Sequence, residues 1–121
     1  MAAPNLVNVS SIYGKSVGAS LGTGNTNILI CGAEKVIKVN SIIVSNVDGS
    51  NSFDATVVFY DASQTANFHI AKVVTVPAKS TLIVMGKDSP VYLEESDKIT
   101  AYASAASDGE IIVSYEELDD A

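Results

Sequence analysis

The stretch Ile99–Tyr115, ITAYASAASDGEIIVSY, carries the pattern that decides the fold. Apolar residues stand at every second position from Ile99 to Ala105, and again from Ile111 to Tyr115. Side chains of a β-strand point alternately to its two faces, so this spacing predicts strands with one buried face. Ser107-Asp108-Gly109 lies between the two runs, and Asp-Gly is a common turn sequence. We therefore expect two antiparallel strands joined by a hairpin.

Similar runs recur towards the N-terminus at intervals of roughly ten residues, separated by Gly, Pro, Asn and Asp. No segment has the sustained period of a helix. We expect further strands at Thr26–Cys31, Val36–Val47, Phe53–Ala62, Phe68–Val76, Thr81–Met85 and Val91–Leu93. About seven to nine short strands at this spacing predict an all-β fold, an antiparallel β-sandwich or a jelly-roll-like barrel.

Local signals add detail to this expectation. Asn40-Ser41 interrupts an apolar run and suggests a bulge or bend. The polar segment Asp48–Ser52 is expected to be a hairpin connection. In the strand that follows, Phe53 and Val57 should share one face, with Thr56 on the other.

Residues 1–27 differ from the rest of the chain, because they are rich in Gly, Ser, Asn and Thr but still carry apolar side chains, which pure linkers lack. We expect an N-terminal arm at 1–27 and a β-sandwich domain at 28–121. The arm either finds its partner elsewhere, for example on a neighbouring subunit, or forms the first strand of the same sandwich. Its candidate interaction residues are Leu6, Val7, Val9, Ile12, Tyr13, Val17 and Leu21.

The composition bounds the function. A chain of 121 residues makes one domain that needs no disulfide or metal to fold. Residues 1–100 hold seven lysines and eight acids, whereas residues 101–121 hold six acids and no lysine. A nearly neutral body suits packing beside its own copies, and an acidic tail favours solubility or a basic partner.

Binding to nucleic acid or to a membrane is not expected. There is no arginine, and the lysines are scattered singly, which does not suit phosphate neutralisation. No apolar run reaches the length of a membrane span, and the N-terminus lacks the features of a signal peptide. We expect synthesis in the cytoplasm.

Residues that could support catalysis are few, and each has a simpler structural interpretation. His69 has no nucleophile-elbow sequence to serve, and Cys31 is expected to be a small buried thiol. Asp48–Asp54 lacks the glycine and the bidentate glutamate of a calcium loop. Glu94-Glu95 with Asp97 more simply builds a turn that discourages pairing at a strand edge. We expect no catalytic residue, no metal, no cofactor and no enzyme activity.

Several segments have a familiar form. They are Asn8–Lys15, Val39–Gly49, Val74–Leu82, Val91–Asp97 and Val113–Glu117. Together they resemble a family of small proteins in the genomes of tailed bacteriophages, particularly phages of cyanobacteria and other marine bacteria. Ser96 departs from this pattern, in which a glycine is expected at that position. A glycine would permit a left-handed turn residue, so we expect the turn to differ locally.

The resemblance implies a β-sandwich structural protein of the virion. The leading hypothesis is a protein that decorates or cements the capsid, as a homo-oligomer and most simply a trimer, with the major capsid protein or other virion proteins as partners. A second hypothesis places it in the neck, tail or a fibre. A third is a carbohydrate-binding module, which the absence of tryptophan weakens.

Overall fold

The computed structural model describes residues 11–119, which form β-strands joined by turns and loops. The alternating sequence pattern explains why: strand after strand places one row of apolar side chains on a common side. The strands are β1 (Ser11–Leu21), β2 (Thr26–Ile30), β3 (Lys35–Asn46), β4 (Phe53–Asp61), β5 (Ala66–Val76), β6 (Thr81–Met85), β7 (Val91–Leu93), β8 (Lys98–Ala103) and β9 (Gly109–Asp119).

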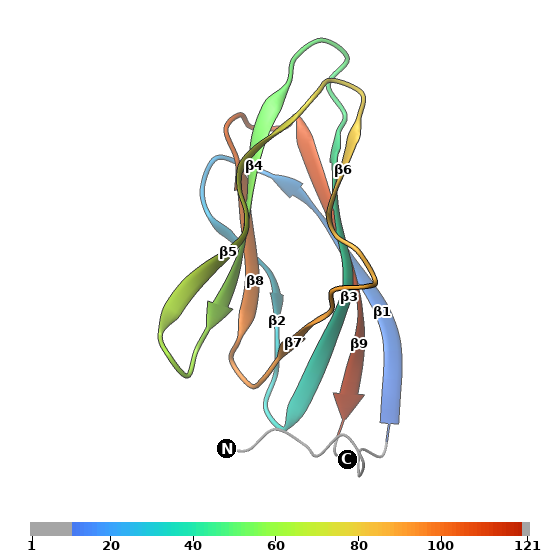
Figure 1. Ribbon diagram of the computed structural model, residues 1–121, viewed down its shortest axis with the longest axis vertical. Coiled ribbons are helices and arrows are strands. Elements are labelled where there is room, and N and C mark those ends of the chain that lie inside the picture. The colour runs from blue at the N-terminus through green and yellow to red at the C-terminus, as the bar shows by residue number, and fades with distance from the viewer. Residues whose placement is uncertain (1–10, 120–121) are drawn as a thin grey trace.

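These strands form two antiparallel sheets packed face to face (Figure 1). Sheet A has the order β1-β9-β3-β6, with β7 also paired to β3, and sheet B has the order β2-β8-β4-β5. The pairs are nested: β1 with β9, β2 with β8, β3 with β6 and β7, and β4 with β5. A long hairpin wrapped around itself in this way is a jelly roll, so the predicted β-sandwich is confirmed.

The core lies between the sheets and follows the predicted alternation. On β8 the inward residues Ile99, Ala101 and Ala103 are buried, and on β4 Phe53 and Val57 are buried. The expected irregularity of β3 is also present, as its pairing with β9 shifts between Val39 and Ser41. Because the buried residues of both sheets meet in one layer, that layer supplies most of the hydrophobic stabilisation.

Both predicted hairpins are wrong. The connection at 48–52 joins β3 in sheet A to β4 in sheet B, and the one at 107–109 joins β8 in sheet B to β9 in sheet A. The two connections lie together instead, since the N–H of Val47 donates to the carbonyl of Asp108 at 2.8 Å. Asn46, buried at the end of β3, donates to the carbonyls of Asn51 and Val76 and so ties the sheets together.

Gly109 is required for packing. Its φ is not positive, but a Cβ added there would lie 2.4 Å from the Phe53 ring. The ring is buried and cannot move away without opening the core. The Asp-Gly sequence thus lets β9 begin close to β4, although the sequence suggested a hairpin turn.

At the opposite end of the sandwich, the carboxylate of Asp97 holds two loops. One oxygen accepts the N–H of Ala62 and the other accepts the N–H of Glu94, both at 2.9 Å. The neighbouring Ser96 has a φ of 73°, so serine adopts the left-handed conformation that a glycine would permit, and the local difference expected there is absent. Asp97 is 3% exposed, and its acceptor oxygens are therefore satisfied by protein groups.

Two buried threonines lie on the outward side of sheet B and differ in their bonding. The hydroxyl of Thr56 accepts the N–H of Val73 at 3.1 Å. Val73 has a φ of 53°, unusual for a β-branched residue, and lies where β5 departs from regular pairing with β4. The hydroxyl of Thr100, on the adjacent β8, is buried without a hydrogen-bond partner.

Candidate interaction surface

The outward face of sheet A carries a row of apolar side chains. The strand register places Gly18 beside Ile112, Ile112 beside Ile43, and Ile43 beside Ile83. Ile83 is 69% exposed and Ile112 is 44% exposed. Large apolar side chains gathered on a sheet face that covers no core are typical of an interaction surface.

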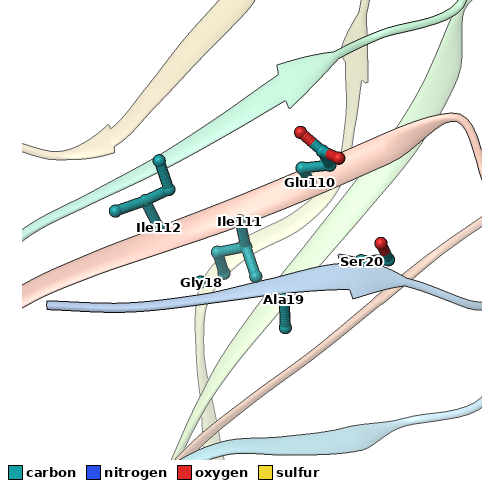
Figure 2. A pocket seen from close by; sticks show the side chains of 6 residues that line it. All are labelled: Gly18, Ala19, Ser20, Glu110, Ile111 and Ile112. Carbon is teal, nitrogen blue, oxygen red and sulfur yellow. The ribbon is translucent and has the colours of Figure 1, made fainter.

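A hollow lies at the β1 end of this row, where Gly18 has no side chain. Its volume is about 450 Å³, and it is lined by Gly18, Ala19, Ser20, Glu110, Ile111 and Ile112. In Figure 2 the side chains of Glu110, Ile112 and Ser20 lie on one side of the two strands, while Ala19 points to the other side. The hollow can therefore accept a small apolar group beside Ile112.

Two further cross-strand rows lie beside the apolar row on this face. Ser16, Ser114 and Ser41 form the next row, and the hydroxyls of Ser16 and Ser114 are 3.3 Å apart. A row with Glu116 and Lys38 follows. The face thus has an apolar row beside hydroxyls and charges, a mixture that suits a protein partner.

Where β1 begins, an ionic cluster joins three strands. Lys15 of β1 lies 3.3 Å from Glu117 of β9, and Lys35 of β3 lies 3.4 Å from Glu117 and 2.9 Å from Asp119. The hydrogen bond to Asp119 is the largest effect that raises the pKa of Lys35 above its ordinary value. These partly exposed pairs add little stability, but the Lys15 pair holds β1 against β9 and the Lys35 pairs hold β3 against β9.

The predicted arm residues are divided among different environments. Leu6, Val7 and Val9 lie outside the described residues. Ile12 and Tyr13 are 61% and 48% exposed at the start of β1, whereas Val17 packs against the core and Leu21 belongs to it. All eleven residues of β1 pair with β9, so residues 11–21 form a strand of the same sandwich. This is one of the two arrangements that the sequence left open.

The outward-facing isoleucines of sheet A were not predicted from the sequence as interaction residues. The signal was present in the doublets Ile42-Ile43 and Ile111-Ile112. In a strand with one buried face, two adjacent isoleucines cannot both point inwards, so one must face outwards. Ile42 and Ile111 are fully buried, and their neighbours Ile43 and Ile112 face outwards.

The residues that could have supported catalysis or metal binding lie apart from one another. His69 is exposed on β5, and Cys31 is buried, which raises the pKa of its thiol to about 11. Asp48 accepts the N–H of Ser50 at 2.9 Å, a bond that lowers the pKa of this carboxyl and closes a turn. Among residues 11–119, no group of three or more His, Cys, Asp or Glu side chains is placed to hold a metal ion.

In the part of the chain that the structure describes, no helix has both the length and the apolar character to cross a membrane.

Comparison with known proteins identifies the fold but no family. No protein-family description matches the chain, and no curated protein matches it. A chain from the disulfide-linked pili of Bacillus endospore appendages is 14% identical with a TM-score of 0.56, over 92% of this chain and 88% of that one. A chain from the acidic stable capsid of Helicobacter pylori bacteriophage KHP30 is 12% identical with a TM-score of 0.53, over 93% and 91%. The chain thus shares its fold with proteins of two large assemblies.

Proposed function

We propose that this protein is a structural component of a phage particle that binds the outside of the assembled head shell and stabilises it. The observation that carries the proposal is the outward-facing apolar row on sheet A, formed by the exposed Ile83 and Ile112 with the half-buried Ile43 between them. An apolar face of this kind stabilises a complex when a partner removes it from water.

Two further observations support an assembly role. The fold similarity extends over nearly the whole chain to a chain of a phage capsid and to a chain of a pilus. The sequence also resembles a family of tailed-phage structural proteins in its turn and strand-end motifs. Low identity limits the first similarity to the fold, so the shell as partner is our inference from the two together.

The proposed mechanism is mass action. A protein that binds the assembled shell, but not its separated subunits, lowers the free energy of the shell with each copy bound. The contribution of buried apolar area is about 25 cal/mol per Å² before the entropy of association is subtracted. Many weakly bound copies can therefore stabilise a lattice that each copy alone would hardly affect.

The experiment is a binding assay with purified shells and two matched variants. Ile83→Asp places a charge in the apolar row of sheet A, whereas Ile30→Asp places one at an isoleucine of sheet B that is 52% exposed. We expect Ile83→Asp to lose sedimentation with the shells and Ile30→Asp to keep it. Equal binding of Ile83→Asp and the unmodified protein would exclude this face as the contact.

The arm proposal has its own test. Because residues 11–21 belong to the sandwich, a deletion must stop at residue 10 to leave the fold intact. If residues 1–10 reach across a subunit boundary, their removal should lower shell binding without changing the unfolding midpoint. Unchanged binding would assign them no part in attachment.

Copy number separates the shell from the alternative of a neck, tail or fibre, which the similarity to a pilus chain favours. Quantitative mass spectrometry of purified virions should find hundreds of copies for a shell protein. A small fixed ring of copies would move the protein to the neck or tail. Absence from the particle would contradict a structural role altogether.

A further inference from the structure

The free edge of β1 is the most regular unpaired strand edge among residues 11–119. The strand pairs with β9 over Ser11–Leu21 without a register shift, contains no proline and carries one charge, Lys15. In an antiparallel strand, alternate residues direct their backbone N–H and C=O groups away from the paired neighbour. About half of the backbone groups of β1 therefore face outwards in a row that another strand can pair with.

The other three edges of the sandwich are protected in ways that β1 is not. β2 is five residues long and has a register shift, and the β6–β7 edge is interrupted by a loop that contains Pro90. β5 has two register shifts and the positive φ of Val73. Short, bulged or interrupted strands discourage edge-to-edge pairing, so only β1 offers a long continuous template in the described region.

Neither backbone conformation nor packing within the described chain requires the two glycines of β1. The φ angles of Gly14 and Gly18 are not positive, and a Cβ on Gly14 would meet nothing within 4 Å. A Cβ on Gly18 would approach no atom closer than 3.7 Å. Glycine is unfavourable inside a strand, where it often marks a place that another backbone approaches closely.

We propose that the free edge of β1 pairs antiparallel with β1 of a second copy of this chain, around a two-fold axis at Ser16. Ser16 is the midpoint of Ser11–Leu21, so this register pairs all eleven residues of each strand. It places Gly14 opposite the Gly18 of the second copy. Sheet A then continues from one copy into the other, and both outward faces lie on the same side.

The charges are compatible with this pairing. Lys15 lies opposite Val17 of the second copy and keeps its own partner Glu117 at 3.3 Å. Glu116 lies beside Gly14, and Gly14 would lie opposite Gly18 of the second copy, which lies beside Ile112 there. The Glu116 side chains of the two copies are therefore in different cross-strand rows and do not face each other. A register centred on Lys15 would place two lysines directly opposite, which is unfavourable. For a chain of net charge −7, the absence of opposed acids matters.

This inference concerns the isolated protein and does not depend on the proposed function. It also differs from the trimer implied by the family resemblance, because a two-fold pair closes on itself. Sedimentation velocity of the full chain at tens of micromolar should therefore give a dimer that dissociates on dilution. A monomer throughout, or a trimer, would overturn the proposal.

Cross-linking with a short bis-maleimide tests the register. At the axis the two Ser16 Cα atoms would be about 4.5–5.5 Å apart, so Ser16→Cys should give a covalent dimer. Ser20→Cys is the matched control, because its two copies would lie about 27 Å apart. Cys31 is 2% exposed, so the unmodified chain should not react. Equal cross-linking of the two variants, or none of Ser16→Cys, would overturn the register.

Charged substitutions at Ser16 give an independent test of the pairing. Ser16→Lys and Ser16→Asp should each weaken the dimer about fivefold, because like charges become direct cross-strand neighbours. An equimolar mixture of the two variants should recover dimerisation. Circular dichroism establishes that both variants are folded. A dimer that tolerates either variant alone would contradict pairing at Ser16.

Discussion

Replacing Asp97 with alanine tests how the loops at one end of the sandwich are held. The carboxylate is 3% exposed and accepts the N–H groups of Ala62 and Glu94, each at 2.9 Å. A hydrogen bond to a charged group contributes about 1.5–3 kcal/mol, so removal of both should lower the free energy of unfolding by about 3–6 kcal/mol. That is a large part of the 5–15 kcal/mol typical of a domain.

Urea unfolding followed by circular dichroism measures this loss. With a slope of about 1–3 kcal/mol per molar urea, the midpoint of Asp97→Ala should fall by about 2 M. Asp97→Asn keeps one acceptor oxygen but turns an amide towards the other N–H, so we expect about half the effect. Its intermediate midpoint would separate lost hydrogen bonds from lost packing.

Glu94→Ala is the matched control, because the Glu94 side chain is exposed on the same turn and its backbone bond to Asp97 remains. An exposed substitution of this kind should change stability by no more than about 0.5 kcal/mol. If Asp97→Ala unfolds within that margin of Glu94→Ala, the assigned role of the carboxylate is refuted.

Three further predictions use the same unfolding assay. Thr100→Val should leave the free energy of unfolding unchanged or raise it by about 1 kcal/mol, because it removes an unpartnered hydroxyl. Thr56→Val should lower it by about 1 kcal/mol through loss of an acceptor, and equal effects of the two variants would contradict the assigned bonding. Gly109→Ala should lower the free energy of unfolding by about 1–3 kcal/mol, because its Cβ would be forced against the buried Phe53 ring. Gly14→Ala, where a Cβ meets open space, should change it by less than about 0.5 kcal/mol, and an equally small effect of Gly109→Ala would contradict the close contact. Burial raises the pKa of Cys31 to about 11 from 9.0, so the contribution of the thiol to stability is constant below pH 9 and falls as the pH rises from 9 to 11. Cys31→Ala should show a shallower loss of stability over this range, and a pH profile identical to that of the unmodified protein would exclude the thiol as the source.

The sequence alone determined the class of fold and most strand positions. Alternation from Phe53 and from Ile99 placed the correct residues inside, because burial of one strand face is a local requirement that every second residue must satisfy. The bulge at Asn40 could be predicted for the same reason, since one added polar residue reverses the alternation of inward and outward side chains.

The candidate surface was less accessible to sequence reasoning. Ile12 and Tyr13 were named and are exposed, but Leu21 entered the core and Ile83 was not singled out. An apolar residue in a strand has the same local pattern whether its face meets the other sheet or the solvent. Only the position of the second sheet distinguishes the two cases.

Tertiary structure decided which sheet each strand joins. Asp48–Ser52 and Ser107–Gly109 reverse the chain in the way their turn residues indicate, yet each carries it across to the other sheet. Turn residues specify local backbone dihedrals, whereas the choice of sheet depends on which apolar faces can be buried together. The alternation of side chains is thus determined by the sequence one strand at a time. The nested pairing, the close contact at Gly109 and the free edge of β1 arise only when the nine strands of residues 11–119 pack around one core.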